Sequence, residues 1–115
     1  DGAIRIDGVS TIATSTATLS TTTETAIDTF AKATFRSCKY IIQATDTVSN
    51  EYHIVEALLI HDGTTATIVE EAAVATGSML GTFTATISGG NILMQVNMGS
   101  SSSATVTVKV NTITV

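Results

Sequence analysis

The feature that most constrains the fold is an alternation of apolar and polar residues with a period of two, repeated between short turn signals. Residues 82–88 alternate between apolar side chains and threonine or serine, and residues 91–98 repeat the alternation. Successive side chains of a strand point to opposite faces, so this pattern predicts half-buried β-strands rather than helices. Threonine supplies about a fifth of the chain and there is no proline. A β-branched residue this abundant also favours strands.

Two glycine-containing dipeptides predict tight hairpins. Asp62-Gly63 accepts the positive φ of a type I′ turn, and Gly89-Gly90 does the same between the two alternating segments. Turn signals of this kind predict about eight strands, over residues 3–9, 26–30, 35–45, 51–61, 64–71, 82–88, 91–98 and 103–110. Short strands separated by such turns are typical of an antiparallel β-sandwich or jelly-roll-like domain. A turn of helix within residues 68–80 stays an alternative.

The strand predicted over residues 51–61 carries apolar residues on both faces, which indicates a central strand covered on both sides. We assign its face with Ile54, Leu58 and Ile60 to the buried layer. The predicted inner layer consists of Tyr40, Ile42, Ile54, Leu58, Ile60, Ile68, Phe83, Ile87, Ile92, Val96, Val106 and Val108.

The amino-terminal quarter differs in composition from the rest. Residues 11–25 are a run of threonine, serine and alanine with few large apolar side chains, too polar to form a core of their own. We therefore divide the chain into an extended Thr/Ser-rich arm, residues 1–25, and a β-sandwich domain, residues 26–115. An extended segment can add as a strand to a neighbouring sheet. The candidate assembly residues of this arm are Ile4, Ile6, Ile12 and Leu19.

The charge balance narrows the range of partners. Ten acidic residues against five basic ones give a net charge of −5. Because binding to a nucleic-acid backbone needs clustered Lys and Arg, we expect no nucleic-acid partner. No stretch approaches the ~20 apolar residues of a membrane-spanning helix, so we expect no membrane insertion.

Few residues carry the chemistry of a catalytic or metal site. His53 and His61 stand eight residues apart on one predicted strand, about 26 Å at 3.3 Å per residue, which is too far for a shared metal. Glu70 and Glu71 are neighbours that project to opposite sides of a strand. Cys38, the single cysteine, lies in an apolar setting typical of an inert thiol. We expect no catalytic residue, no metal and no cofactor, and hence no enzyme.

Glycan binding is an alternative function. Sugars commonly stack on exposed aromatic rings of β-sandwich modules, but this chain has no tryptophan and two tyrosines. An exposed Tyr52 or His53 in a groove would favour binding of host-surface glycans.

Three segments in order carry a resemblance to a known family: residues 35–40 (FRSCKY), 58–66 (LLIHDGTTA) and 81–91 (GTFTATISGGN). Together they resemble a domain of virion structural proteins of tailed bacteriophages, especially those of marine cyanobacteria. The resemblance covers residues 27–110. It implies a structural subunit of the virion, in a fibre, the tail or a capsid decoration, with no catalytic residue carried across. The implied partners are other copies of the chain and other virion proteins. A subunit of a cell-surface or extracellular filament is the alternative.

Overall fold

A computed structural model describes residues 3–46, 48–99 and 106–114, the last stretch as backbone only. The element order comprises nine strands: β1 (Ile4–Ile6), β2 (Ser10–Leu19), β3 (Thr25–Ala31), β4 (Ser37–Asp46), β5 (Glu51–His61), β6 (Ala66–Ala75), β7 (Gly81–Ser88), β8 (Asn91–Met98) and β9 (Val106–Thr114). The predicted all-β sandwich is confirmed. The described part contains no helix long and apolar enough to cross a membrane.

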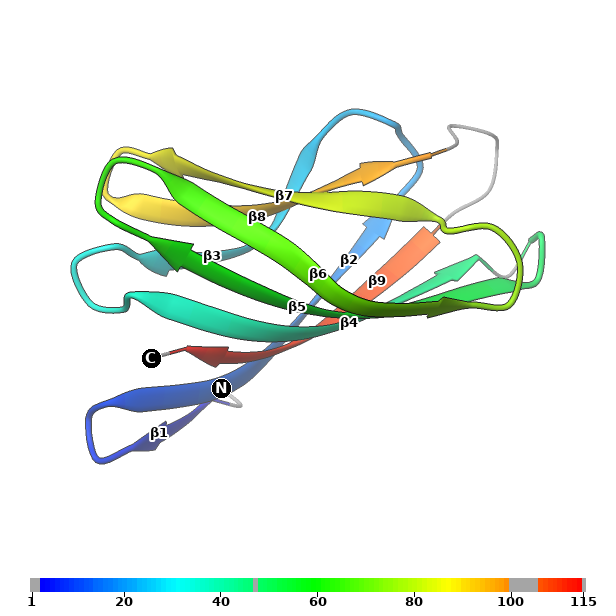
Figure 1. Cartoon of the computed structure of the whole chain (residues 1–115). Coiled ribbons are helices and arrows are strands. Elements are labelled where there is room, and N and C mark those ends of the chain that lie inside the picture. The colour runs from blue at the N-terminus through cyan, green and yellow to red at the C-terminus, as the bar shows by residue number, and fades with distance from the viewer. Residues whose placement is uncertain (1–2, 47, 100–105, 115) are drawn as a thin grey trace.

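The strands form two antiparallel sheets. The larger one has six strands in the order β1-β2-β9-β4-β5-β6, and the smaller one has the order β3-β8-β7. Figure 1 shows the smaller sheet lying over one face of the larger, with the β1–β2 hairpin projecting at one end. The fold therefore has one covered face and one uncovered face on the six-stranded sheet.

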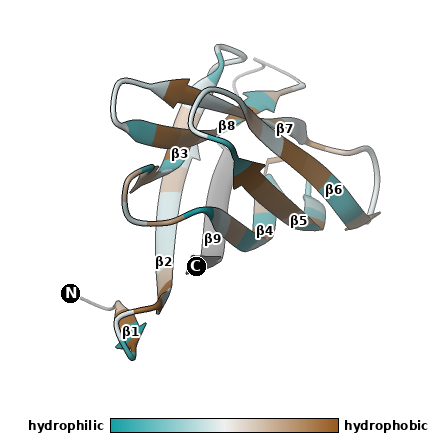
Figure 2. Cartoon of the chain, turned by 60° about the vertical axis from the view of Figure 1, so that its left-hand side comes forward, coloured by the Kyte–Doolittle hydropathy of each residue, from teal (hydrophilic) through white to brown (hydrophobic). Residues whose placement is uncertain are grey.

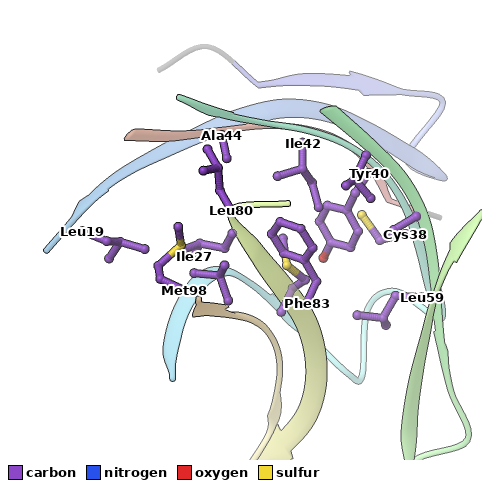
Figure 3. Packing of buried hydrophobic residues seen from close by; sticks show 14 of the residues in the cluster. Leu19, Ile27, Cys38, Tyr40, Ile42, Ala44, Leu59, Leu80, Phe83 and Met98 are labelled. Carbon is purple, nitrogen blue, oxygen red and sulfur yellow. The ribbon is translucent and has the colours of Figure 1, made fainter. Parts of the chain in front are cut away.

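The core lies between the sheets and is filled from alternate positions of each strand. Buried residues on β4 and β5 include Tyr40, Ile42, Val55, Ala57 and Leu59, and Ile92, Met94 and Val96 face them from β8. Tyr40 stands opposite Ala57 in the β4–β5 register, so a small side chain makes room for a large ring. Figure 3 shows Tyr40, Ile42 and Phe83 pointing into this shared space.

The predicted inner layer is wrong along β5. The buried face of β5 carries His53, Val55, Ala57, Leu59 and His61, whereas Ile54, Leu58 and Ile60 are 46%, 43% and 56% exposed. Hydropathy favoured the wrong face because two of the buried positions are histidines. Elsewhere Tyr40, Ile42, Phe83, Ile92 and Val96 are buried as predicted. Ile68 and Ile87 pack partly buried against the core, and the side chains of Val106 and Val108 lie outside the description.

Two local predictions also change. The β5–β6 connection is a loop of residues 62–65 rather than a two-residue turn. The Asp62 carboxylate caps it by accepting hydrogen bonds from the N–H groups of Thr64 and Thr65, which lower the pKa of Asp62 to about 2. The helical alternative for residues 68–80 is replaced by the second half of β6. The Gly89-Gly90 hairpin is confirmed, with Ser88 opposite Asn91 and a positive φ at Gly89.

Two side-chain hydrogen bonds join the two sheets. The Tyr40 hydroxyl of β4 donates to the Asp28 carboxylate of β3 at 2.9 Å, and the Ser15 hydroxyl of β2 donates to the Ile27 carbonyl at the same distance. Asp28 follows a register irregularity of β3 and is partly buried. Burial raises the pKa of this carboxyl, and the Tyr40 hydrogen bond opposes the rise. In this partly buried pair, each polar group therefore has a hydrogen-bond partner.

Candidate interaction surfaces

Both histidines are buried on the covered face of the six-stranded sheet. His61 bridges two loops: its Nε2 lies 2.7 Å from the Phe35 carbonyl, and its Nδ1 accepts the Gly63 N–H at 3.1 Å. With Nδ1 as the acceptor, Nε2 is the ring nitrogen placed to donate to the Phe35 carbonyl. His53 Nδ1 accepts the Leu80 N–H at 3.3 Å. Each histidine therefore organises a loop at one end of the sandwich, and the idea of an exposed His53 in a groove is wrong.

The burial of His53 predicts a pH dependence of stability. Burial lowers the pKa of His53, and the nearby Glu70 charge opposes that shift. The unfolded chain then binds a proton below a pH of about 6.5 that the folded chain does not, so the free energy of unfolding falls as the pH drops below that value. Urea midpoints of the wild type and of His53→Asn, measured between neutral and mildly acidic pH, should diverge. Parallel pH profiles of the two proteins would contradict the assignment.

The carboxylates do not gather into a site. Glu70 and Glu71 are both exposed where β6 slips by one residue against β5. Asp46 is occupied as a turn cap, since its Oδ1 accepts the N–H groups of Val48 and Ser49. Within residues 3–46, 48–99 and 106–114, no three His, Cys, Asp or Glu side chains meet as metal ligands would.

Cys38 is a buried thiol on β4, 3% exposed, with Sγ against the Lys39 carbonyl at 3.7 Å. A thiol in this position packs as a small apolar side chain.

The four candidate residues of the amino-terminal arm have different surroundings. Ile4 and Ile6 on β1 are 59% and 47% exposed, and Ile12 stands half-buried opposite Ile4. Leu19, in contrast, is buried in the core at the end of β2. Nine positions of β2 pair with β9, so residues 11–19 form part of the six-stranded sheet. The use of residues 1–25 as an assembly arm stays a prediction, and within it the β1 hairpin is the part that offers exposed apolar side chains.

The uncovered face of the six-stranded sheet is apolar over β4, β5 and β6. Its exposed members, which we call the outer stripe, are Ile41, Ile54, Leu58, Ile60, Val69 and Val74. A hollow of about 590 Å³ lies among Lys39, Leu58, Ile60 and Val69, and a second of about 220 Å³ lies among Ile41, Ile54 and Val74. Figure 2 shows apolar residues running along β5 and part of β6. Sequence reasoning missed this surface, although the apolar residues on both faces of residues 51–61 were its signal.

Tyr52 lies at the end of the same face. Its side chain is 38% exposed, and its hydroxyl donates to the Asn50 Oδ1 at 3.0 Å. The Tyr52 N–H donates to the Thr76 hydroxyl at 3.0 Å, which ties the strand end to the β6–β7 connection. The ring is therefore held at an accessible position by one side-chain hydrogen bond, on a strand end fixed by a backbone one.

Comparison with solved structures finds the same fold within three phage tailspike proteins. The chain is similar to the tailspike protein of Acinetobacter baumannii phage AM24, at 13% identity and a TM-score of 0.54 over 94% of this chain. It is similar to the tailspike of Acinetobacter phage vB_ApiP_P1, at 12% identity and a TM-score of 0.59 over 90% of this chain. It is also similar to the tailspike gp49 of Acinetobacter baumannii bacteriophage Fri1, at 19% identity and a TM-score of 0.53 over 97% of this chain. That tailspike is described as a capsular polysaccharide depolymerase.

The matches extend over 26%, 22% and 19% of those tailspike chains, so this chain spans about a quarter or less of their length. At these identities the likeness shows a shared fold. No family model matches the chain, and no curated protein sequence matches it.

The expectation that the chain is not an enzyme is corrected by these structures. The same fold lies within tailspike chains, one of which is a capsular polysaccharide depolymerase. A sandwich of this shape therefore occurs inside an enzyme polypeptide, and a lack of familiar catalytic motifs in this chain is no ground for excluding enzymatic activity.

Proposed function

We propose that this chain is a β-sandwich domain of a bacteriophage tail protein of the tailspike kind, carried on the virion. The observation that carries the proposal is the fold shared with three phage tailspikes over 90–97% of this chain. The ordered segments at residues 35–40, 58–66 and 81–91 resemble virion proteins on independent grounds. The tail is favoured over a capsid decoration because the three similar structures described above are tailspikes.

Mass spectrometry of purified particles, separated into heads and tails, tests this proposal. Peptides of the chain are expected in the tail fraction. Peptides confined to the head fraction, or absent from intact particles, would contradict it and would favour a capsid decoration or a filament subunit of the cell surface.

Within such a tail we propose that the domain assembles with other copies of itself and with other virion proteins. The motivation is the amount of apolar surface that the six-stranded sheet and the β1 hairpin leave exposed, including Ile4, Ile6 and Val9 at 59%, 47% and 62%. Contiguous apolar surface of this kind marks an interaction site on a monomeric domain.

A second function, recognition of host polysaccharide, is favoured by Tyr52. An accessible ring offers a flat apolar face to the C–H groups of a sugar, and the neighbouring Asn50 offers hydrogen bonds. The description of one similar tailspike as a capsular polysaccharide depolymerase supplies the ligand class to test.

Replacing Tyr52 by alanine tests this second function. We expect binding to purified host capsular polysaccharide to weaken by about tenfold or more, equivalent to 1.4 kcal/mol, because the stacking surface is lost. Tyr52→Phe is the matched control, since it keeps the ring and loses only the Asn50 hydrogen bond. Isothermal titration calorimetry measures all three proteins. Equal affinities of the wild type and Tyr52→Ala would exclude Tyr52 as the sugar platform.

A further inference from the structure

The connection between β6 and β7, residues 76–80, crosses from the six-stranded sheet to the three-stranded sheet at one end of the sandwich (Figure 1). Its first residue is tied to β5, because the Thr76 N–H donates to the Tyr52 carbonyl at 2.9 Å and the Thr76 hydroxyl accepts the Tyr52 N–H at 3.0 Å. Its last residue, Leu80, is buried in the core, and residues 77–79 are exposed. The connection is therefore an exposed segment that is held at its two ends.

Two hydrogen bonds of different kinds hold Leu80. Its carbonyl accepts the Gly99 N–H at 2.9 Å, a bond between backbone groups. Its N–H donates to His53 Nδ1 at 3.3 Å, so this second bond depends on a titratable side chain. The His53 ring is 3% exposed and lies beside the Phe83 ring, with 6.3 Å between the ring centroids. The closed connection therefore needs a His53 ring without a proton on Nδ1.

A protonated His53 ring does not fit this arrangement. Both ring nitrogens would then be donors, so Nδ1 would face the Leu80 N–H with a proton on each side. Nε2 is buried and has no hydrogen-bond partner among the described residues. Because a buried charge without a partner is strongly destabilising, the closed form excludes the proton. Burial accordingly lowers the pKa of His53.

The carboxylates around this end of β5 do not compensate the charge. They are Asp46 and Glu51, which stand opposite each other on β4 and β5, and Glu70 on β6. Within the part of the chain that the structure describes, none of the three forms an ion pair with His53. The Glu70 charge raises the pKa of His53, but burial outweighs it. β7, β8 and the connection itself carry no titratable residue, so a protonated ring in the closed form has no counter-ion among these groups.

We propose that His53 is a pH-sensitive switch for the β6–β7 connection: protonation of its ring releases the Leu80 N–H, and residues 77–80 open while the rest of the sandwich stays folded. Thr76 is the fixed point of this movement, because its two hydrogen bonds to Tyr52 involve no titratable group. A hollow of about 250 Å³ that Met79 and Leu80 help to line lies beside the moving segment. The switch does not depend on where in a virion the chain is found.

Native-state hydrogen exchange of the whole chain, followed by NMR between about pH 5 and pH 7.5, tests the proposal. The reporters are the N–H groups of Leu80 and Gly99, whose hydrogen bonds break on opening, and the Leu59 N–H in the middle of β5 reports global unfolding. The open form binds a proton below about pH 6.5 that the closed form excludes. After correction for intrinsic exchange, we expect the protection of Leu80 and Gly99 to fall by about threefold or more in acid, at most tenfold per pH unit.

Two variants locate the effect. His53→Asn keeps an acceptor for the Leu80 N–H and does not titrate, so its corrected protection should be independent of pH. His61→Asn is the matched control at the other end of β5, and it should keep the wild-type pH dependence at Leu80 and Gly99.

A flat profile of Leu80 and Gly99 in the wild type overturns the proposal, and it does so even if His53→Asn does not fold. A pH dependence that persists in His53→Asn, or disappears in His61→Asn, also overturns it. Equal protection of Leu80 and Leu59 at every pH would mean that the whole sandwich opens, which contradicts a local switch. None of these results bears on whether the chain is found in the tail fraction.

Discussion

Replacing Tyr40 by alanine is expected to lower the free energy of unfolding by about 3–5 kcal/mol, the range for removing a large buried aromatic side chain. Tyr40 is 0% exposed, and it fills the space opposite Ala57 between the two sheets. The substitution leaves a cavity and also leaves the Asp28 carboxylate without its hydroxyl donor. Equilibrium urea denaturation measures the change. A loss below about 1 kcal/mol, typical of surface substitutions, would show that Tyr40 does not join the sheets.

Tyr40→Phe isolates the hydrogen bond from the packing. It should cost about 1–3 kcal/mol at neutral pH, because a buried acceptor loses its partner. Burial already raises the pKa of Asp28, and losing the Tyr40 donor raises it further. A group whose pKa is raised on folding stabilises the folded state at low pH, and this contribution is lost as the pH rises through the folded pKa. The cost of Tyr40→Phe should therefore shrink in acid. Tyr52→Phe, at an exposed tyrosine, is the control and should show neither effect.

The second large effect separates two adjacent leucines of β5. Leu59→Ala should lower the free energy of unfolding by about 2–5 kcal/mol, whereas Leu58→Ala should cost about 1 kcal/mol or less. Leu59 is 1% exposed in the core, and Leu58 is 43% exposed on the outer stripe. Denaturation at a low protein concentration keeps self-association out of the comparison. Equal costs, or a larger cost for Leu58→Ala, would mean that β5 turns its other face to the core.

This pair of leucines shows what the sequence leaves undecided. Periodicity placed a strand at Glu51–His61 with the observed bounds, and the strand Asn91–Met98 likewise. When both faces of a strand carry apolar residues, the alternation of side chains does not show which face is covered. That depends on how the strands are arranged in the fold. On the covered face of β5, both ring nitrogens of His61 have partners, at Phe35 and Gly63, whereas His53 has a partner for Nδ1 only, the Leu80 N–H, and its Nε2 is buried without one.

The Thr-rich strand β2 escaped prediction for a related reason. Residues 10–19 hold little apolar surface, and their order comes from pairing with β9, some ninety residues further along the chain. Such a distant pairing leaves no local signal. Of the candidate assembly residues, Ile4 and Ile6 are exposed on the β1 hairpin and Leu19 lies in the core, and their role in assembly stays a prediction. The outer stripe became visible only once the covered face was known.

The central claim, that this sandwich is part of a phage tail, is tested most directly by electron microscopy of particles labelled with an antibody fragment against the chain. The account predicts fragments bound at the tail, on its spikes. The epitope should lie outside the outer stripe and the β1 hairpin, for example at the exposed β7–β8 turn around Gly89 and Gly90, so that assembly leaves it open. Fragments bound only to the head, or particles that bind none while the isolated chain binds them, would contradict the account.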